Sequence, residues 1–375
     1  MKKGLKELTA QITRMGSYPE QDVTFLLKDL SEITMEKSTD EREQAIQQGT
    51  HYSEMLPIEY KPTEEYMKLF YASLEETKHK VAVAVGVVAE QIVAERGFQT
   101  VLVSLARAGT PIGVLIKRYL FYKYDQSFPH YSISIIRDRG IDEEALRYIL
   151  NEHPGSSISF IDGWTGKGAI TNELTKSVDE FNTITGENLS SELAVLADPG
   201  DCSSLFGTRE DFLIPSACLN STVSGLVSRT VLNKRCIHKG DFHGAKYYSE
   251  LASEDVSNLY VDTICSQFPL IDNEVESGLE EIKKQKRKPE WKGLESIENI
   301  QRDFGITNSH LIKPGVGETT RVLLRRVPWK ILVHPNAEMN LEHILILARD
   351  RGVPIEEYSN MSYSCCGLIK PLEKE

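Results

Sequence analysis

The chain has 375 residues, which is more than one ordinary domain, and we expect two domains. Its 40% hydrophobic and 26% charged residues are typical of a globular protein with a real core, and no apolar run approaches the roughly 20 residues of a membrane helix, which excludes a membrane protein. The net charge of −12 argues against attraction of nucleic acid over the whole surface.

Six cysteines are scattered along the chain, and only Cys365 and Cys366 lie close together. This pattern predicts reduced thiols in a cytoplasmic protein rather than a disulfide framework. No pair of cysteines has the spacing of a zinc site, so we expect no structural metal. The N-terminal stretch up to Met15 is charged and has no continuous apolar run, so it does not predict a signal peptide.

Short apolar strands alternate with helices between residues 81 and 197. Helices are predicted at 81–95, from Pro111 onward, at 142–151 and at 169–182, and strands at 100–105, 131–136, 157–161 and 193–197. The alternation implies an α/β fold, with a mostly parallel sheet covered by helices on both faces. In such sheets, ligands bind at the C-terminal ends of the strands, where the βα loops gather.

The regular pattern weakens after about residue 270, and a charged stretch follows. Residues 274–295, which include the run KKQKRK, predict a basic linker after a first domain of residues 1–273. Between Lys283 and Lys330 there are 12 basic and 5 acidic residues, a local charge of +7 that leaves −19 for the rest of the chain. Residues 296–375 alternate again, with helices at 318–326 and 341–351 and strands at 330–333 and 353–358, and predict a second compact domain.

A glycine-rich loop follows the strand at 157–161. The sequence FIDGWTGKG contains an acidic residue, three glycines, a hydroxyl and an amine, namely Asp162, Gly163, Thr165, Gly166, Lys167 and Gly168. Glycines let the backbone approach a ligand closely, and successive N–H groups before a helix attract an anion. The spacing is not that of a Walker A loop. We expect a phosphosugar site here, and an ordinary tight turn is the alternative.

This loop resembles the phosphoribosyl-pyrophosphate loop of type I phosphoribosyltransferases, although Gly163 stands where that family has a second acidic residue. A second match is the sequence R-A-G at Arg107, Ala108 and Gly109, which resembles the pyrophosphate loop of the same family. The resemblance implies a type I phosphoribosyltransferase-like sheet and an enzyme that transfers the phosphoribosyl group to or from a base or nucleoside-like acceptor. It also implies Mg²⁺ bound with the pyrophosphate.

Two further arginines follow the strand at 131–136. Arg137 and Arg139 would lie at the same edge of the sheet as Arg107 and Asp162 and would neutralise a polyanionic substrate. Together these four residues form the expected catalytic group. The alternative is a surface cluster of ion pairs with the neighbouring aspartates.

The segment at 211–230 contains small polar residues around Cys218, and His243 follows it. A cysteine and a distant histidine can form a thiolate–imidazolium pair, which would make a hydrolase. A packed, inert Cys218 is the alternative, because free cysteine is among the most buried residue types. Ser221, Thr222 and Ser224 are also candidates to line an acceptor pocket.

Over residues 15–270 the chain also resembles the bacterial stress-associated StiP family, which is described as cysteine-protease-like. The matching stretches are HYSEMLP at 51–57, the R-A-G and T-G-K-G loops, and PSACLNSTVSG at 215–225. This resemblance implies a cysteine protease using Cys218 and His243, in a stress and tellurium-resistance context, as the alternative to the phosphoribosyltransferase.

The C-terminal sequence GVGETTRVLLRR at 315–326 resembles a helix start in the Pelota-like and kink-turn-binding family. The stretches WKILVH at 329–334 and RGVPI at 351–355 match that family's layout. The resemblance implies an α/β/α RNA-binding domain that contacts RNA through Glu318, Thr319, Arg321 and Arg325. A third reading of the whole chain is therefore a non-catalytic RNA-binding protein with a degenerate nucleotide pocket.

Overall fold

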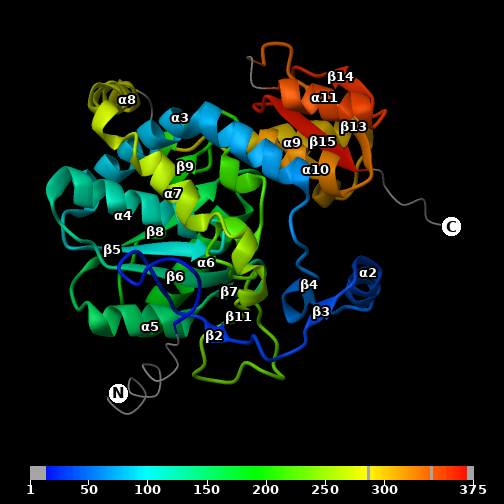
Figure 1. Ribbon diagram of the computed structural model, residues 1–375. Coiled ribbons are helices and arrows are strands. Elements are labelled where there is room, and N and C mark those ends of the chain that lie inside the picture. Colours follow the sequence, from blue (N-terminus) through cyan, green and yellow to red (C-terminus); the bar gives the residue numbers. More distant parts are fainter. Residues whose placement is uncertain (1–13, 285–287, 338–340, 370–375) are drawn as a thin grey trace.

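A mainly parallel sheet forms the centre of the first part of the chain in the computed structural model, which describes residues 14–284, 288–337 and 341–369 (Figure 1). Within these residues the sheet has seven strands, ordered β1-β6-β5-β8-β9-β10 with β7 antiparallel on β6. Their bounds are β1 Thr24–Phe25, β5 Thr100–Ala106, β6 His130–Ile136, β7 Gly140–Ile141, β8 Ser157–Trp164, β9 Leu193–Ala197 and β10 Leu205–Thr208. The fold class, α/β with a mostly parallel sheet, is confirmed. The finer expectation of a phosphoribosyltransferase-type sheet stays a prediction.

Helices cover the two faces of this sheet. α3 and α4 contact the sheet on one face, and α7 and α8 pack against them, whereas α5 and α6 lie on the other face (Figure 1). Right-handed crossovers produce this arrangement, because the connection after β5 and the connection after β6 run in opposite directions. The bounds are α3 Glu64–Arg96, α4 Thr110–Tyr124, α5 Glu143–Glu152, α6 Ala169–Thr185, α7 Ser257–Cys265 and α8 Asp272–Lys284.

The central strands are short and apolar because both of their faces are buried. Every residue of β9 is buried, and only the last residue of β5 is partly exposed. β10 lies against α3, where Gly207 allows close approach, since an added Cβ would sit 2.3 Å from the Ala84 carbonyl oxygen.

Small elements surround this sheet. They include α2 Thr39–Gln47, the strand pair β3 Glu36–Lys37 and β4 Leu56–Pro57, and the pair β2 Lys28–Asp29 and β11 Gly244–Ala245. Short 3-10 turns lie at Tyr52–Glu54, Pro215–Ala217, Ser221–Val223, Ser249–Glu254, Phe268–Leu270 and Ser309–Leu311.

The C-terminal part forms its own four-stranded sheet within the described residues, in the order β12-β15-β13-β14. The strands are β12 Ile312–Pro314, β13 Pro328–Val333, β14 Ile355–Glu357 and β15 Cys365–Ile369, and the helices are α9 Lys292–Phe304, α10 Val316–Arg325 and α11 Glu342–Asp350. Ile300, Leu332 and Leu368 belong to an apolar cluster that is separate from the main core.

The two parts are joined by a buried carboxylate. One oxygen of Asp211 accepts from the backbone N–H of Val316 at 2.9 Å, and the other accepts from the N–H of Ser364 at 2.9 Å. Burial raises the pKa of Asp211 to about 6, against these hydrogen bonds, which lower it. The Asp211 carboxylate thus supplies the acceptor at the start of α10 that the Gly315 cap cannot supply.

Most predicted elements are confirmed, with shifted bounds. The first long helix begins at Glu64 rather than at residue 81. Within the predicted linker, the residues up to Lys284 belong to α8, which packs on α3 with Val275 and Ile282 buried. Residues 285–287 of the KKQKRK run lie outside the described residues. In the two large sheets, the strands β1, β7, β10, β12 and β15 were not predicted. None of the described helices is long and apolar enough to cross a membrane.

We expect Asp211→Ala to loosen the contact between the two parts, because the amides of Val316 and Ser364 lose their buried acceptor. Hydrogen exchange at these two amides should accelerate roughly tenfold to a hundredfold at pH 7.5. Asp350→Ala, which removes an exposed carboxylate at the end of α11, is the matched control. Unchanged protection of both amides would contradict the role assigned to Asp211.

Candidate functional site

The strand order reverses between β5 and β8, and polar residues gather at this point. β5 is flanked by β6 on one side and β8 on the other, so the loops that follow β5 and β8 diverge and leave a crevice at their C-terminal ends. Arg107 directly follows β5, after a cis peptide bond to Ala106, and Asp162 lies near the end of β8. Because β5 and β8 are parallel neighbours, the two loops lie side by side at this edge of the sheet.

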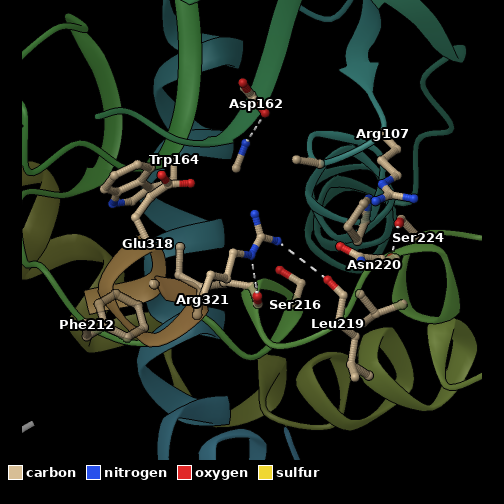
Figure 2. A pocket seen from close by; sticks show the side chains of 17 residues that line it. Arg107, Asp162, Trp164, Phe212, Ser216, Leu219, Asn220, Ser224, Glu318 and Arg321 are labelled. Atoms are coloured by element: carbon tan, nitrogen blue, oxygen red, sulfur yellow. Dashed lines mark hydrogen bonds between the residues drawn. The ribbon is translucent and has the colours of Figure 1, made fainter. Parts of the chain in front are cut away.

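A cavity of about 240 Å³ opens at this crevice, between the two parts of the chain. Figure 2 shows Asp162 on one side, Arg107, Asn220 and Ser224 on another, and the Arg321 side chain pointing into the space between them. α10 of the C-terminal part contributes Glu318 and Arg321 to the lining. The site is therefore built from both predicted domains.

Asp162 is the acidic group at the head of this cavity. Its carboxylate accepts from the backbone N–H of Gly163 at 2.7 Å. Burial raises the pKa of Asp162 to about 7, because this single hydrogen bond offsets little of the desolvation. A carboxyl that titrates near neutral pH can exchange protons with a bound ligand.

Arg107 lies on the opposite wall, with Ala108 beside it. Its guanidinium donates to the Val227 carbonyl at 3.3 Å and lies 3.8 Å from a Glu59 carboxylate oxygen. Gly109 allows the β5 loop to approach β8 closely, because a Cβ there would sit 2.5 Å from the Ile161 carbonyl oxygen. The R-A-G sequence thus has a packing role at its glycine and a charged role at its arginine.

The glycine-rich loop faces the C-terminal part of the chain. The Thr165 hydroxyl donates to Asp198, Lys167 donates to the Ser309 carbonyl, and the Gly166 carbonyl accepts from the Tyr363 hydroxyl at 3.0 Å. Burial lowers the pKa of Lys167 to about 8. These side chains are thus engaged with protein groups.

A second cavity, of about 500 Å³, lies along the outer side of this loop. It is lined by Gly168 and the start of α6, and by Lys313 of the C-terminal part. Arg137 also lines it and lies 3.3 Å from His310. Arg139 does not line it and instead pairs with Glu54 at 3.1 Å.

The structure gives Cys218 and His243 different neighbours. Cys218 is 1% exposed, and its sulfur lies 3.8 Å from the Ser73 hydroxyl of α3. His243 is bonded through Nδ1 to the Ser134 hydroxyl of β6 at 2.9 Å, and its backbone N–H donates to Asp142. Neither of these contacts joins Cys218 to His243, and the thiolate–imidazolium pair stays a prediction.

The expected RNA-contacting residues of α10 face the first part of the chain. Thr319 is fully buried, and the Arg321 guanidinium donates to the carbonyls of Ala217 at 2.8 Å and Leu219 at 3.5 Å. Glu318 lines both cavities. The side chain of Arg325 lies outside the described residues. Arg321 therefore holds the two carbonyls that flank Cys218.

Sequence reasoning missed three residues of the site. Trp164 lines both cavities. Glu59 accepts a hydrogen bond from the Ser221 hydroxyl at 2.8 Å and also lies beside Arg107. The Asp198 carboxylate accepts a hydrogen bond from the Thr165 hydroxyl. Of these, Asp198 had a signal, because it directly follows the buried strand β9 and so lies at the ligand-facing edge. No local pattern distinguishes Glu59 from other surface acids.

Comparison with known proteins identifies two matching families. Residues 16–265 match the model described as tellurite-like stress resistance cysteine protease StiP. Residues 291–371 match the PELOTA RNA binding domain. A protein of Acinetobacter baylyi named "Cysteine protease StiP" is 34% identical over 372 residues, which cover 96% of this chain and 95% of that protein. The resemblances to the StiP and Pelota-like families are thereby confirmed.

The expectation of a phosphoribosyltransferase is wrong, because both the family model and the Acinetobacter relative carry the name of a cysteine protease. The loop geometry gives a physical reason for the error. Thr165 and Lys167, expected to reach phosphate oxygens, are bonded to Asp198 and Ser309, and Asp162 has no acidic neighbour in the sequence. The Mg²⁺ expectation rested on that substrate and stays a prediction.

The raised pKa of Asp162 predicts a dependence of stability on pH. The folded-state pKa of about 7 exceeds the unfolded value of about 4, so the folded state holds this proton more tightly, and stability falls as pH rises from about 4 to 7. The Asp162→Asn variant has no carboxyl group to ionise at this position, so it does not lose stability in this way as pH rises. The midpoint of urea unfolding of the variant, relative to wild type, should therefore be higher at pH 8 than at pH 5. Asp350→Asn, which changes an exposed aspartate of α11, is the matched control. An Asp162→Asn difference that does not change with pH would contradict the raised pKa.

Proposed function

Because the chain belongs to the StiP family, we propose that it is a cysteine-dependent hydrolase of the protease type, with its substrate bound in the cavity between the two domains. The observation that carries this proposal is the position of Cys218. Its neighbours Ala217 and Leu219 both line the cavity, and their carbonyls are held by Arg321 from the C-terminal domain. Of the six cysteines, Cys218 is the one that lies within a segment lining this cavity.

Burial of the thiol sets a condition on the reaction. Cys218 is 1% exposed and contacts Ser73, so the segment at 215–224 must move before the sulfur can attack a substrate. Arg321 links this movement to the C-terminal domain, because its two hydrogen bonds must lengthen or exchange. Substrate binding would then supply the free energy for the change, as in other enzymes that assemble their sites on closure.

The chemistry that follows needs a base and a stabilised oxyanion. The thiolate attacks the carbonyl carbon and forms a thioester, the amine leaves with a proton, and water then hydrolyses the thioester to an acid and the free thiol. Asp162, with a pKa of about 7, is the cavity group suited to proton transfer at neutral pH. The Arg321 guanidinium points into the same space and can stabilise developing negative charge (Figure 2).

We expect Cys218→Ser to lower kcat/KM for peptide hydrolysis by a factor on the order of 10³ or more, because the hydroxyl is a much weaker nucleophile. The measurement is cleavage of a mixed peptide library by the full chain, followed by mass spectrometry. A peptide aldehyde should also form an adduct at Cys218 in the wild type alone.

The matched control is Cys265→Ser, a half-buried cysteine on α7 whose thiol pKa burial raises to about 11. This variant should keep wild-type activity. Cleavage that survives in folded Cys218→Ser, or is lost equally in both variants, would overturn the assignment of Cys218.

A second function is favoured by the match of residues 291–371 to the PELOTA RNA binding domain. We propose that this domain binds RNA, and the placement of its cations supports the proposal. Lys313 and Arg321 lie on the cavity side of the domain, whereas Lys330 lies within about 5 Å of the Trp329 and Phe304 rings, a combination that suits phosphates and stacked bases.

We expect the full chain to bind a labelled structured RNA with an affinity that falls steeply with salt. If several phosphates are contacted, raising salt from 50 to 200 mM should weaken binding at least tenfold. Fluorescence anisotropy with a hairpin containing an internal loop measures this. Absence of saturable binding at 50 mM salt would refute this second function.

A further inference from the structure

A third cavity, of about 700 Å³, adjoins the proposed hydrolase site and shares Arg107, Leu219, Asn220 and Arg321 with it. The described residues that line it include six cations and one carboxylate. The cations are Arg42, Lys61, Arg107, Arg229, Arg321 and Arg326, and the carboxylate is Glu59. This cavity is therefore strongly positive, although the chain as a whole has a net charge of −12.

The charges come from segments far apart in sequence. Arg42 belongs to α2, Lys61 precedes α3, Arg107 follows β5, and Arg326 ends α10. Holding like charges close together costs free energy unless counter-charge is present. The fold therefore holds these side chains in an arrangement that their own repulsion disfavours.

The available counter-charge inside the cavity is small. Glu59 lies 3.8 Å from Arg107, but its other oxygen already accepts from the N–H and the hydroxyl of Ser221. Lys61 pairs with Glu254, which does not line the cavity. Glu59 is thus the one carboxylate among the described residues that line the cavity.

Arg229 shows most clearly that positive charge exceeds negative charge in this cavity. Its guanidinium donates to the carbonyls of Tyr52 and Met55 at 2.8 and 2.9 Å, which are neutral acceptors, and its buried Nε has no hydrogen-bond partner among the described residues. Burial, followed by the positive charges of Arg42 and Arg107, lowers the pKa of Arg229 to about 10. An anion in the cavity would supply the missing acceptor.

We infer that this arginine-lined cavity binds a ligand with at least two phosphate groups, either a free nucleotide or polyphosphate or the backbone of an RNA strand that reaches the C-terminal domain. Arginine suits such ligands because its planar fork donates two hydrogen bonds to one phosphate. A cavity of this size accommodates several phosphates, and the walls contributed by Tyr60 and Tyr66 offer aromatic surface for a base. The inference does not depend on hydrolysis by Cys218, and it stands with or without RNA binding.

The test uses the full chain and two probes, inorganic tripolyphosphate by calorimetry and a single-stranded RNA of twelve uridines by anisotropy. Arg229→Gln should raise the Kd of at least one probe by about tenfold or more. Since Arg229 also anchors two backbone carbonyls, the double variant Lys61→Gln/Arg326→Gln, which changes two exposed cations at the rim, is measured beside it. Arg302→Gln, an exposed arginine of α9 outside the cavity, is the matched control.

The outcomes separate this inference from the proposed RNA binding. Tripolyphosphate binding that both cavity variants weaken, without RNA binding, supports a free phosphate ligand. RNA binding whose salt dependence loses about 0.7 in log–log slope for each removed cation supports the RNA strand. RNA binding that the cavity variants leave at the level of Arg302→Gln, with no tripolyphosphate binding, overturns the inference while leaving the RNA-binding domain intact. Absence of both binding activities overturns the inference, whereas the RNA-binding proposal is decided by the structured hairpin.

Discussion

The carboxylate of Asp211 determines where the C-terminal domain meets the sheet. Its two oxygens bind the N–H groups of Val316 and Ser364, which belong to different elements of that domain, so it fixes both the start of α10 and the approach to β15. Burial that raises its pKa to about 6 shows that the protein keeps an ionisable group in an unfavourable place. The geometry of both cavities beside α10 follows from this contact.

From that fixed start, α10 delivers its side chains at helical spacing. Glu318 and Arg321 are three residues apart, so they lie on one face, and that face is turned toward Asp162 and the segment around Cys218 (Figure 2). Close packing supports the arrangement: a Cβ at Gly315 would sit 2.6 Å from the Trp164 ring, and one at Gly293 would sit 2.7 Å from the Gly166 carbonyl oxygen. Residues of both domains therefore line the same cavity.

This shared surface changes what the families imply for the chain. A PELOTA helix start that contacts RNA in isolation would be open to solvent, whereas here Thr319 is fully buried and Arg321 is bonded to Ala217 and Leu219. Arg321 borders the proposed hydrolase cavity on one side and the arginine-lined cavity on the other. A ligand that contacts Arg321 in the arginine-lined cavity would thus change its hydrogen bonds to the two carbonyls that flank Cys218.

The sequence by itself determined the elements and the edge of the sheet where the site lies. The runs TVLVSL and LAVLA form buried strands because their residues are apolar on both faces. Arg107 and Asp162 lie at the same edge of the sheet because each follows or ends a strand of a parallel sheet. Both family resemblances also rest on local motifs, which a single chain displays without its fold.

Only the tertiary structure decided which of these residues act on one another. It placed Lys167 and Thr165 against Ser309 and Asp198, and it gave Cys218 and His243 separate neighbours. It also brought arginines from four distant segments together around the arginine-lined cavity. Local patterns report burial and backbone conformation, whereas a site depends on distances between segments that only packing sets, and those distances are not encoded in any short stretch of sequence.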